Sequence, residues 1–372
     1  MKEENLINLS NDAVKGNVLF FMVDPSIVSI LRKEFLKSEI TVNETDDEET
    51  ARKFLKNSDL DIVLSDFTPN DNKAVDFFQF VKKKYPSINR IFLGETEEEK
   101  TLHIMVTKNI ATSYFEKPHG IGDILQSVAH ILRVRKKLKN KELVKLLSVT
   151  DDLSGFLKTY YDFTTAIEED RSPHDIALIL EKDVSIATKV LKIANSAFYR
   201  ASRIGSVERA CIYLGLDTLK NIVFAVSLSS VKRLNSEQNH HMERIIYHSL
   251  KVNQNFQRFY KLETGKIAPP DYTSIGITHD VGKIIMLQYM PERFNRILKY
   301  QKRNPDIGFY RSELELGFVG CTHTEIGAYF LDLWNFPEVS IYTALFHHNP
   351  EESFDTHREL MDIFSFVNEF AK

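Results

Sequence analysis

Short, largely apolar runs recur through the first 115 residues of this chain, and apolar residues at helical spacing separate them. The runs occupy residues 18–23, 62–64, 91–93 and 113–115. A strand without polar alternation is typical of a parallel sheet, because helices cover both faces of the sheet and neither meets solvent. The alternation of strand and helix therefore predicts a doubly wound, parallel α/β sheet in the N-terminal part of the chain.

Charged residues stand at the ends of three of these runs. Asp24 belongs to the end of the first run, Asp66 to the second and Lys117 to the last. The functional groups of parallel sheets gather at the carboxyl ends of the strands, so we expect these side chains at one edge of the sheet. An Asp at such an edge can accept a phosphoryl group while a Lys stabilises the added negative charge.

The pattern changes from residue 121 onward. Apolar residues keep a helical period to residue 134, and a basic stretch follows over residues 133–145 without a Gly/Ser-rich linker. We therefore expect a helix to couple two parts of the chain, with its basic residues on a solvated face. Beyond residue 147 only helical periods occur, which predicts an all-α second domain. The predicted organisation is an N-terminal tail at 1–15, the α/β domain at 16–135, a helical connector at 136–147 and the all-α domain at 148–372.

Composition argues against several classes of protein. The net charge of −4 argues against direct DNA binding, which requires clustered excess Lys and Arg. The run at residues 18–23 is far shorter than the roughly 20 apolar residues of a membrane-spanning helix, and the N-terminus lacks a secretory signal pattern. Only Cys211 and Cys321 are present, so no disulfide framework is implied. We expect a cytoplasmic protein with reduced thiols and no membrane association.

Histidines of the second part are candidate metal ligands. The candidates are the adjacent His279 and Asp280, together with His248, His323, His347 and His348. Imidazoles and a carboxylate from different helices can close around one or two divalent ions inside a helical bundle. The spacings leave a second interpretation open, in which each His is an ordinary core or surface residue.

Three features of the N-terminal domain match a known family. Asp66 ends an apolar run, Lys117 precedes Pro118, and Tyr114 stands where the family often has a switching aromatic residue. On these residues and the β-α rhythm, residues 16–135 resemble the receiver domain of two-component response regulators. The resemblance implies that Asp66 receives a phosphoryl group, with a cognate histidine kinase as partner and Mg²⁺ bound beside it.

The N-terminal domain departs from the receiver pattern at the Mg²⁺ site. Val23 stands at the first acidic position and Asp24 at the second, and Gly94 or Glu95 stands where the family has a Ser or Thr hydroxyl. Because Mg²⁺ is held by oxygen ligands, we expect weak or absent Mg²⁺ binding and poor neutralisation of a transferring phosphoryl group. The expected role is a degenerate receiver that docks a partner or dimerises, and phosphorylation of Asp66 is the alternative.

Several motifs of the second domain match another family. They lie at residues 183–199, 206–210, 214–216, 279–283 and 347–350, with Glu313, His323, Gly327 and Trp334 as further matching residues. Over about residues 148–370 the chain resembles an HDOD domain, the HD-related output domain of bacterial signalling proteins. The resemblance implies an HD-like, all-α output module that is generally non-enzymatic.

The resemblance extends to the metal ligands of HD-superfamily phosphohydrolases. Carried over by position, it implies ligands at His248, His279, Asp280, His323 and His347 or His348. Such enzymes use a metal-bound water to attack a phosphoester. Asn368 stands in place of the closing Asp, and Asp362 lies about two helical turns away. The missing carboxylate argues against hydrolysis, while a divalent ion (Fe, Mn, Zn or Mg) is the expected cofactor.

Two polar residues inside the HDOD motif are predicted to be hydrogen-bond anchors. Asn195 and Ser196 fall within a helical run, where such residues often bond to the backbone. The alternative is that this region supplies a groove for an anionic ligand, lined by Lys189, Lys192 and Arg209.

Together these observations predict a bacterial signal-transduction protein. In it a degenerate receiver-like domain regulates a largely non-catalytic HDOD domain, which binds a protein partner, a small anionic effector or a metal. Two alternatives remain: an HD-type, metal-dependent phosphohydrolase acting on a nucleotide or cyclic dinucleotide, and a metal or redox sensor without turnover. A homodimer is compatible with either arrangement.

Overall fold

Two compact units make up the chain. The computed structural model describes residues 14–37, 39–57, 59–68, 72–95, 98–107, 110–117, 121–137, 140, 142–143, 146, 153–196, 204–334, 336–353 and 358–371. The first unit is Met1–Ser148 with Asp332–Asn335, and the second is Val149–Leu331 with Phe336–Lys372. The predicted tail and connector are described only in part. Within the described residues, no helix combines the length and the hydropathy needed to cross a membrane.

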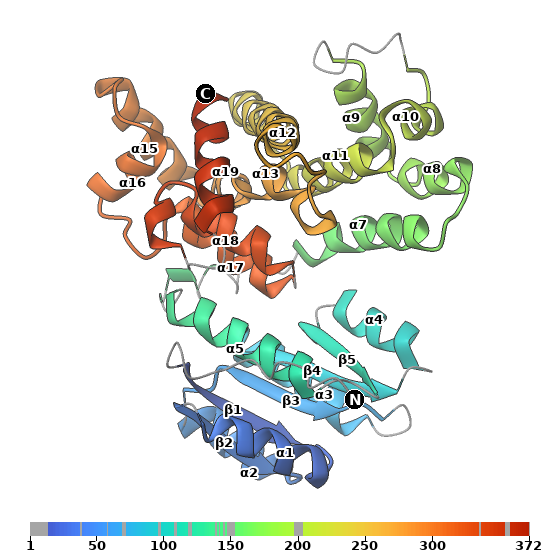
Figure 1. Ribbon diagram of the computed structural model, residues 1–372, viewed down its shortest axis with the longest axis vertical. Helices are drawn as coiled ribbons and strands as arrows, with labels where there is room; N and C mark the ends of the chain where they lie inside the picture. Colours follow the sequence, from blue (N-terminus) through green and yellow to red (C-terminus); the bar gives the residue numbers. More distant parts are fainter. Residues whose placement is uncertain are drawn as a thin grey trace. The chain divides into compact units, whose positions relative to one another are not determined.

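A five-stranded parallel sheet forms the centre of the first unit (Figure 1). Its strands are β1 (Lys15–Phe21), β2 (Glu39–Thr45), β3 (Ile62–Asp66), β4 (Asn89–Glu95) and β5 (Ser113–Lys117). They lie in the order β2-β1-β3-β4-β5, which is that of flavodoxin-like folds, so the expected doubly wound α/β sheet is confirmed. The apolar pattern does not reveal β2, because this edge strand buries only Ile40.

Helices cover both faces of this sheet. They are α1 (Pro25–Phe35), α2 (Glu48–Asn57), α3 (Lys73–Lys84), α4 (Glu99–Thr107) and α5 (Ile121–Lys137). Successive residues of β1 enter two different clusters: Val18 and Phe20 pack with residues of α1 and α5, whereas Leu19 and Phe21 pack with α2, α3 and α4. Each fully buried large side chain contributes about 1.5–3 kcal/mol, which explains why the strand is apolar on both sides.

The first strand ends earlier than its apolar run predicts. It stops at Phe21, and Met22 takes a φ of 55°, in the left-handed region. Asp24 then becomes the N-cap of α1, where its Oδ1 accepts a hydrogen bond of 2.7 Å from the backbone N–H of Ser26. The Asp24 carboxylate therefore satisfies a helix-terminal N–H group.

Helices alone form the described part of the second unit, which confirms the predicted all-α domain. The α-helices are α7 (Leu153–Glu168), α8 (Pro173–Glu181), α9 (Val184–Ala194), α10 (Val207–Leu214), α11 (Leu216–Ser229), α12 (Ser236–Thr264), α13 (Ile275–Thr278), α14 (Val281–Tyr289), α15 (Pro291–Arg303), α16 (Phe309–Glu315), α17 (His323–Leu333), α18 (Glu338–Phe346) and α19 (Arg358–Phe370). The long helix α12 begins with a capping box of Asn235 and Gln238 and ends at Gly265, whose φ is 68°. These residues supply the partners that helix termini lack.

Two glycines bring helix backbones into direct contact near the middle of this unit. A Cβ atom on Gly282 of α14 would lie 1.8 Å from the carbonyl oxygen of His323 in α17. A Cβ atom on Gly276 of α13 would lie 2.3 Å from the Cα atom of Asn253 in α12. Only glycine permits such approaches, and they fix the segment between α13 and α14 against two other helices.

Candidate metal centre

Separate helices place the candidate ligands around one carboxylate. His248 lies in α12, His279 and Asp280 lie between α13 and α14, His323 begins α17, and His347 and His348 follow α18. The side chains of His279, His323 and Asp280 are almost completely inaccessible to solvent. An ionised carboxylate at such a depth requires compensating positive charge or hydrogen bonds.

The two oxygens of Asp280 face different neighbours. Oδ1 lies 3.4 Å from Nε2 of His323 and 3.5 Å from Nε2 of His347. Oδ2 lies 3.4 Å from Nε2 of His279 and 2.7 Å from Nζ of Lys283. Asp280 is therefore the centre of the cluster, with imidazoles on both sides.

Backbone carbonyls hold two of these imidazoles in one orientation. Nδ1 of His279 lies 2.8 Å from the carbonyl oxygen of Gly276, and Nδ1 of His347 lies 3.0 Å from that of Ala344. A carbonyl oxygen only accepts, so each Nδ1 carries the proton and donates. The lone pair of each ring is then on Nε2, the atom that faces Asp280.

A carboxylate holds the third imidazole. Glu313 is fully buried in α16, and its two oxygens accept hydrogen bonds from the backbone N–H of His323 at 2.7 Å and from Nδ1 of His323 at 2.6 Å. A carboxylate on the far nitrogen of a metal-binding imidazole fixes its tautomer and increases its basicity. The motif residue Glu313 thus orients His323 toward Asp280.

The atoms that face the centre of the cluster have unused bonding capacity. Among the described residues, Nε2 of His279, His323 and His347 and Oδ1 of Asp280 are buried without a hydrogen-bond partner. The potential ligand atoms of His323, His347 and His348 lie within 4.8 Å of one another. Buried polar atoms without partners are destabilising, and a cation beside Oδ1 of Asp280 would satisfy three of these four, namely that oxygen and Nε2 of His323 and His347. The donor set therefore fits a divalent metal.

The protonation states of the buried imidazoles and of Asp280 also favour metal binding. Burial holds the pKa of His279 well below its ordinary value and also lowers the pKa of His347 and His348, so these rings are neutral. Burial by itself raises the pKa of Asp280, but the positive charge of the Lys283 ammonium, 2.7 Å from Oδ2, holds that pKa well below its usual range. Neutral imidazoles beside an ionised carboxylate are the protonation states that metal binding requires.

His323 differs from these rings. Burial lowers its pKa, but the carboxylate of Glu313 outweighs burial and raises the pKa above its ordinary value. The same contact makes Nε2 of His323 a stronger electron donor toward an ion.

The side of the cluster next to Oδ2 already has positive charge and a proton donor. The Lys283 ammonium lies 2.7 Å from Oδ2 of Asp280. Nε2 of His248 lies 3.7 Å from Oδ2 of Asp280 and 3.1 Å from Oδ1 of Asn368. Because a carboxamide oxygen only accepts, His248 donates there and keeps no lone pair on Nε2. The Oδ1 side, with His323 and His347, is therefore the better position for an ion.

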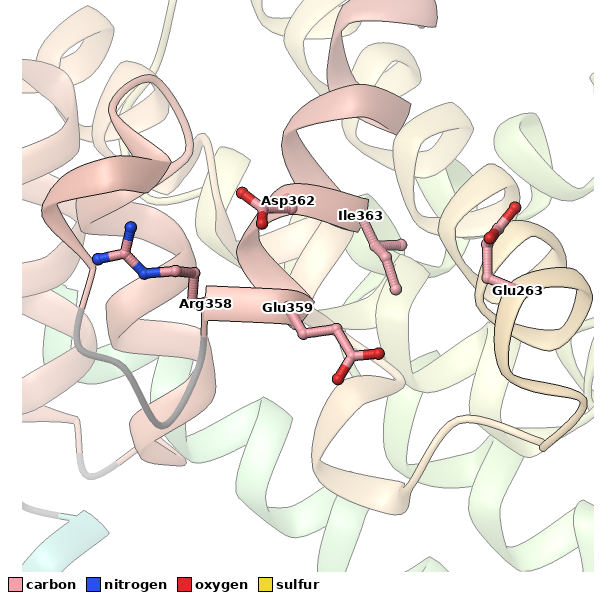
Figure 2. A pocket seen from close by; sticks show the side chains of 5 residues that line it. All are labelled: Glu263, Arg358, Glu359, Asp362 and Ile363. Carbon is pink, nitrogen blue, oxygen red and sulfur yellow. The ribbon is translucent and has the colours of Figure 1, made fainter.

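Asp362 does not replace the carboxylate missing at position 368. Asn368 is buried on α19, whereas Asp362 is exposed on another face of the same helix. Figure 2 shows Asp362 with Glu359 and Glu263 around a surface depression whose lining includes none of the histidines. Among the described residues, Asp280 is thus the carboxylate that faces the Nε2 atoms of the candidate ligands, whereas Glu313 binds the opposite nitrogen of His323.

In the first unit, the residues that carry the resemblance to receiver domains have the following environments. Oδ2 of Asp66 accepts a 2.7 Å hydrogen bond from the backbone N–H of Asp24, whose own carboxylate caps α1. Tyr114 lies partly buried on β5, against the cluster that contains α3 and α4. The backbone of Lys117 ends β5, and its side chain lies outside the described residues.

Asn195 and Ser196 have different environments. Asn195 is the C-cap of α9. Its carboxamide donates a 2.8 Å hydrogen bond to the carbonyl oxygen of Ile204 and accepts one of 2.7 Å from the N–H of the same residue. This pair of bonds joins the two ends of the segment between α9 and α10. Oγ of Ser196 has no hydrogen-bond partner among the described residues.

Sequence reasoning gave no role to Lys283. Lys283 follows Asp280 by three residues, and side chains at this spacing lie side by side on a helix. The spacing could therefore have predicted the ion pair between them. No sequence spacing predicts that basic and aromatic residues of α12 and α16 lie near Asp280, because these helices are distant from it along the chain.

Comparison with known proteins identifies the second unit. A model of the HDOD domain family matches residues 158–350, more than half of the chain. An uncharacterised protein of Treponema pallidum is 26% identical over 226 residues, which cover 59% of this chain and 42% of that protein. The uncharacterised protein YuxH of Bacillus subtilis is 24% identical over 128 residues, 34% of this chain and 30% of that protein. The chain thus spans less than half the length of these curated relatives.

A solved structure is also similar. An HDOD domain protein of unknown function from Geobacter sulfurreducens aligns with 25% identity and a TM-score of 0.44, covering 57% of this chain and 70% of that one. Since the family match covers more than half of the residues and includes the His279-Asp280 segment and His323, the chain belongs to the HDOD domain family.

Proposed function

We propose that this protein is a signal-transduction protein whose HDOD unit is a regulatory module built around one divalent metal ion. The ion would be held by His323, His347 and Oδ1 of Asp280, with His348 beside them. The observation that carries the proposal is the set of buried Nε2 atoms that face Asp280 without a hydrogen-bond partner. A structural role alone would not leave several adjacent buried acceptors unsatisfied.

The donor set favours particular metals. Imidazole nitrogens are typical ligands of Zn, Fe and Mn, whereas Mg²⁺ prefers oxygen ligands and retains bound waters. At this position Nε2 of His323 and Nε2 of His347 lie 3.4 Å and 3.5 Å from Oδ1 of Asp280. We therefore propose Zn²⁺ or Fe²⁺ in preference to Mg²⁺.

The surroundings of Asp280 favour a regulatory rather than a hydrolytic role. A bound divalent ion supplies Lewis acidity and lowers the pKa of water, which hydrolysis requires. The neutral carboxamide of Asn368 stands in place of the closing acid, and the Lys283 ammonium forms an ion pair with Oδ2 of Asp280. Both features reduce the negative charge that would hold a second ion.

Metal analysis tests this proposal. The purified full chain, loaded with Zn²⁺ or with Fe²⁺ under anaerobic conditions, is expected to retain about one ion per chain after desalting, because only one side of Asp280 is free of a competing cation. His323→Ala should lose the ion. His240→Ala is the matched control, since His240 is exposed on α12 and is not among the candidate ligands.

Hydrolysis assays separate the enzymatic alternative. With bis(p-nitrophenyl) phosphate and with cyclic dinucleotides we expect no turnover by the loaded chain. Turnover that Asp280→Ala abolishes and His240→Ala retains would establish the phosphohydrolase reading and overturn the regulatory one. A chain that retains no ion under any loading condition would refute the metal centre.

For the first unit we propose a degenerate receiver that signals by docking rather than by phosphorylation. Val23 supplies no carboxylate at the first acidic position, and the Asp24 carboxylate at the second caps α1, so few oxygen ligands are available to hold Mg²⁺ beside Asp66. Treatment with acetyl phosphate and Mg²⁺ followed by mass spectrometry should show no labile adduct at Asp66. An adduct that Asp66→Asn removes would contradict docking alone and implicate a histidine kinase.

A further inference from the structure

A cavity of about 850 Å³ opens beside the metal cluster within the second unit. Residues of α12, α14, α15, α16 and α19 line it, and Asp280, His248 and His348 are among them. The buried His279, His323 and His347 are not part of the lining. The cavity is therefore an outer chamber that reaches the cluster from the side of Lys283 and Asn368.

The charge of this chamber is mainly positive. Its lining contains four cationic side chains, Arg244, Lys251, Lys283 and Arg311, but a single carboxylate, Asp280. That carboxylate is already paired with Lys283, and Arg311 pairs with Glu315, which lies outside the lining, so Arg244 and Lys251 supply the excess positive charge. Arg244 is exposed on α12 and forms no ion pair with any residue that the structure describes. A concave site with such an excess of positive charge attracts an anion, and guanidinium and ammonium groups suit phosphate oxygens.

Aromatic rings form a second part of the lining. Tyr310 stacks on His348 with ring centroids 4.8 Å apart and an interplanar angle of 10°. Phe309 lies beneath the Lys283 ammonium, 5.3 Å from its ring centroid, and packs against Phe294 at 5.4 Å. Flat aromatic groups of a ligand stack on such surfaces, whereas a simple inorganic anion would leave them unused.

The volume of the chamber agrees with a ligand that has both an anionic group and a flat aromatic ring. Cavities for small organic molecules are of the order of 300–1,000 Å³, well above the space that a phosphate ion needs. From the charge, the aromatic rings and the volume, we infer that this cavity binds a small ligand with a phosphate group and a flat aromatic ring, of the nucleoside monophosphate class. This inference rests on the proposed regulatory role of the HDOD unit, for which such a ligand would be the effector.

In this arrangement the phosphate group pairs with Lys283 and Arg244, and the ring stacks near Tyr310. A phosphate on Lys283 would compete with Asp280 for the same ammonium. Occupation of the chamber would therefore alter the charge beside the metal cluster, which gives the ligand a route to change the state of that cluster.

Isothermal titration of the full, metal-loaded chain tests the inference. The probes are AMP, GMP, CMP and UMP, with adenosine and ribose 5-phosphate as the two halves of AMP. At least one nucleoside monophosphate should bind, and for AMP we expect about tenfold tighter binding than for either half, because each half keeps only one set of contacts. Failure of all four monophosphates to bind at about 1 mM, the weak end of specific affinities, would overturn the inference.

A pair of matched variants locates the binding site. Arg244→Gln should weaken binding of the monophosphate about tenfold, since it removes one charged hydrogen-bond donor. Arg258→Gln removes an exposed Arg from the same helix but outside the cavity and should leave the affinity unchanged. Equal losses in the two variants would show that net charge alone attracts the probe, and equal affinity for AMP and ribose 5-phosphate would show that the rings are not used. Either result overturns the inference.

The outcome is distinguishable from failure of the metal proposal. Metal content of the same samples is measured independently by elemental analysis. A chain with metal but without ligand binding refutes only this inference, whereas ligand binding by a chain without metal refutes only the metal centre.

Discussion

Replacement of Gly282 by alanine should force apart the two helices that position His323. A Cβ atom at residue 282 would lie 1.8 Å from the carbonyl oxygen of His323 and 2.7 Å from the N–H nitrogen of Gly327. Both contacts are with backbone, so no side-chain rotation relieves them, and α14 and α17 must separate by about 1 Å or more to restore normal contact distances. Overpacking of a tight core costs about 1–3 kcal/mol, and a backbone clash belongs at the upper end, about 3 kcal/mol.

Calorimetric unfolding measures this loss. For a domain of this size, about 3 kcal/mol corresponds to a decrease in the midpoint of the second unit of roughly 6–12 °C. Metal retention should decrease as well, because His323 moves relative to Asp280. Gly205→Ala is the matched control, since a Cβ atom there would meet nothing within 4 Å. If Gly282→Ala unfolds at the same temperature as Gly205→Ala, the close packing of α14 on α17 is wrong.

Three further predictions concern single contacts in the second unit. Glu313→Gln removes the charge from the group that accepts the Nδ1 hydrogen of His323, so metal affinity measured by competition with a chelator should decrease about 10–100-fold; an unchanged affinity would mean that His323 is not a ligand. Asn195→Ala removes both bonds to Ile204 and should lower the free energy of unfolding by about 1–3 kcal/mol in urea titrations, and a loss under about 0.3 kcal/mol would contradict the anchoring role. Burial lowers the folded-state pKa of His347 below its unfolded value of about 6.5, so the unfolded state binds more protons and stability should decrease as pH falls below about 6.5. Urea unfolding in EDTA at several pH values checks this, and the pH slope should be smaller in His347→Gln.

The sequence by itself determined the class of each unit. Continuous apolar strands such as residues 18–23 require a sheet buried on both faces, and the clusters around Phe20 and Phe21 on opposite sides of β1 have this arrangement. The helical periods after residue 147 likewise led to an all-α unit. These patterns are local, because the period of apolar residues follows directly from how many faces of an element are buried. The edge strand β2 escaped prediction because only Ile40 is buried on it.

The sequence also named the candidate ligands, but only the tertiary structure decided what each one does. Residues 248, 279, 323 and 347 are distant along the chain, so spacing could not show that their rings surround Asp280. Nor could it show that backbone carbonyls and Glu313 direct Nε2 of His279, His347 and His323 toward that carboxylate. It also could not show that Lys283 takes one oxygen of Asp280, or that Arg244 and Tyr310 line the same chamber. Distances between side chains on different helices depend on how the helices pack, and that packing is fixed by close approaches such as the one at Gly282.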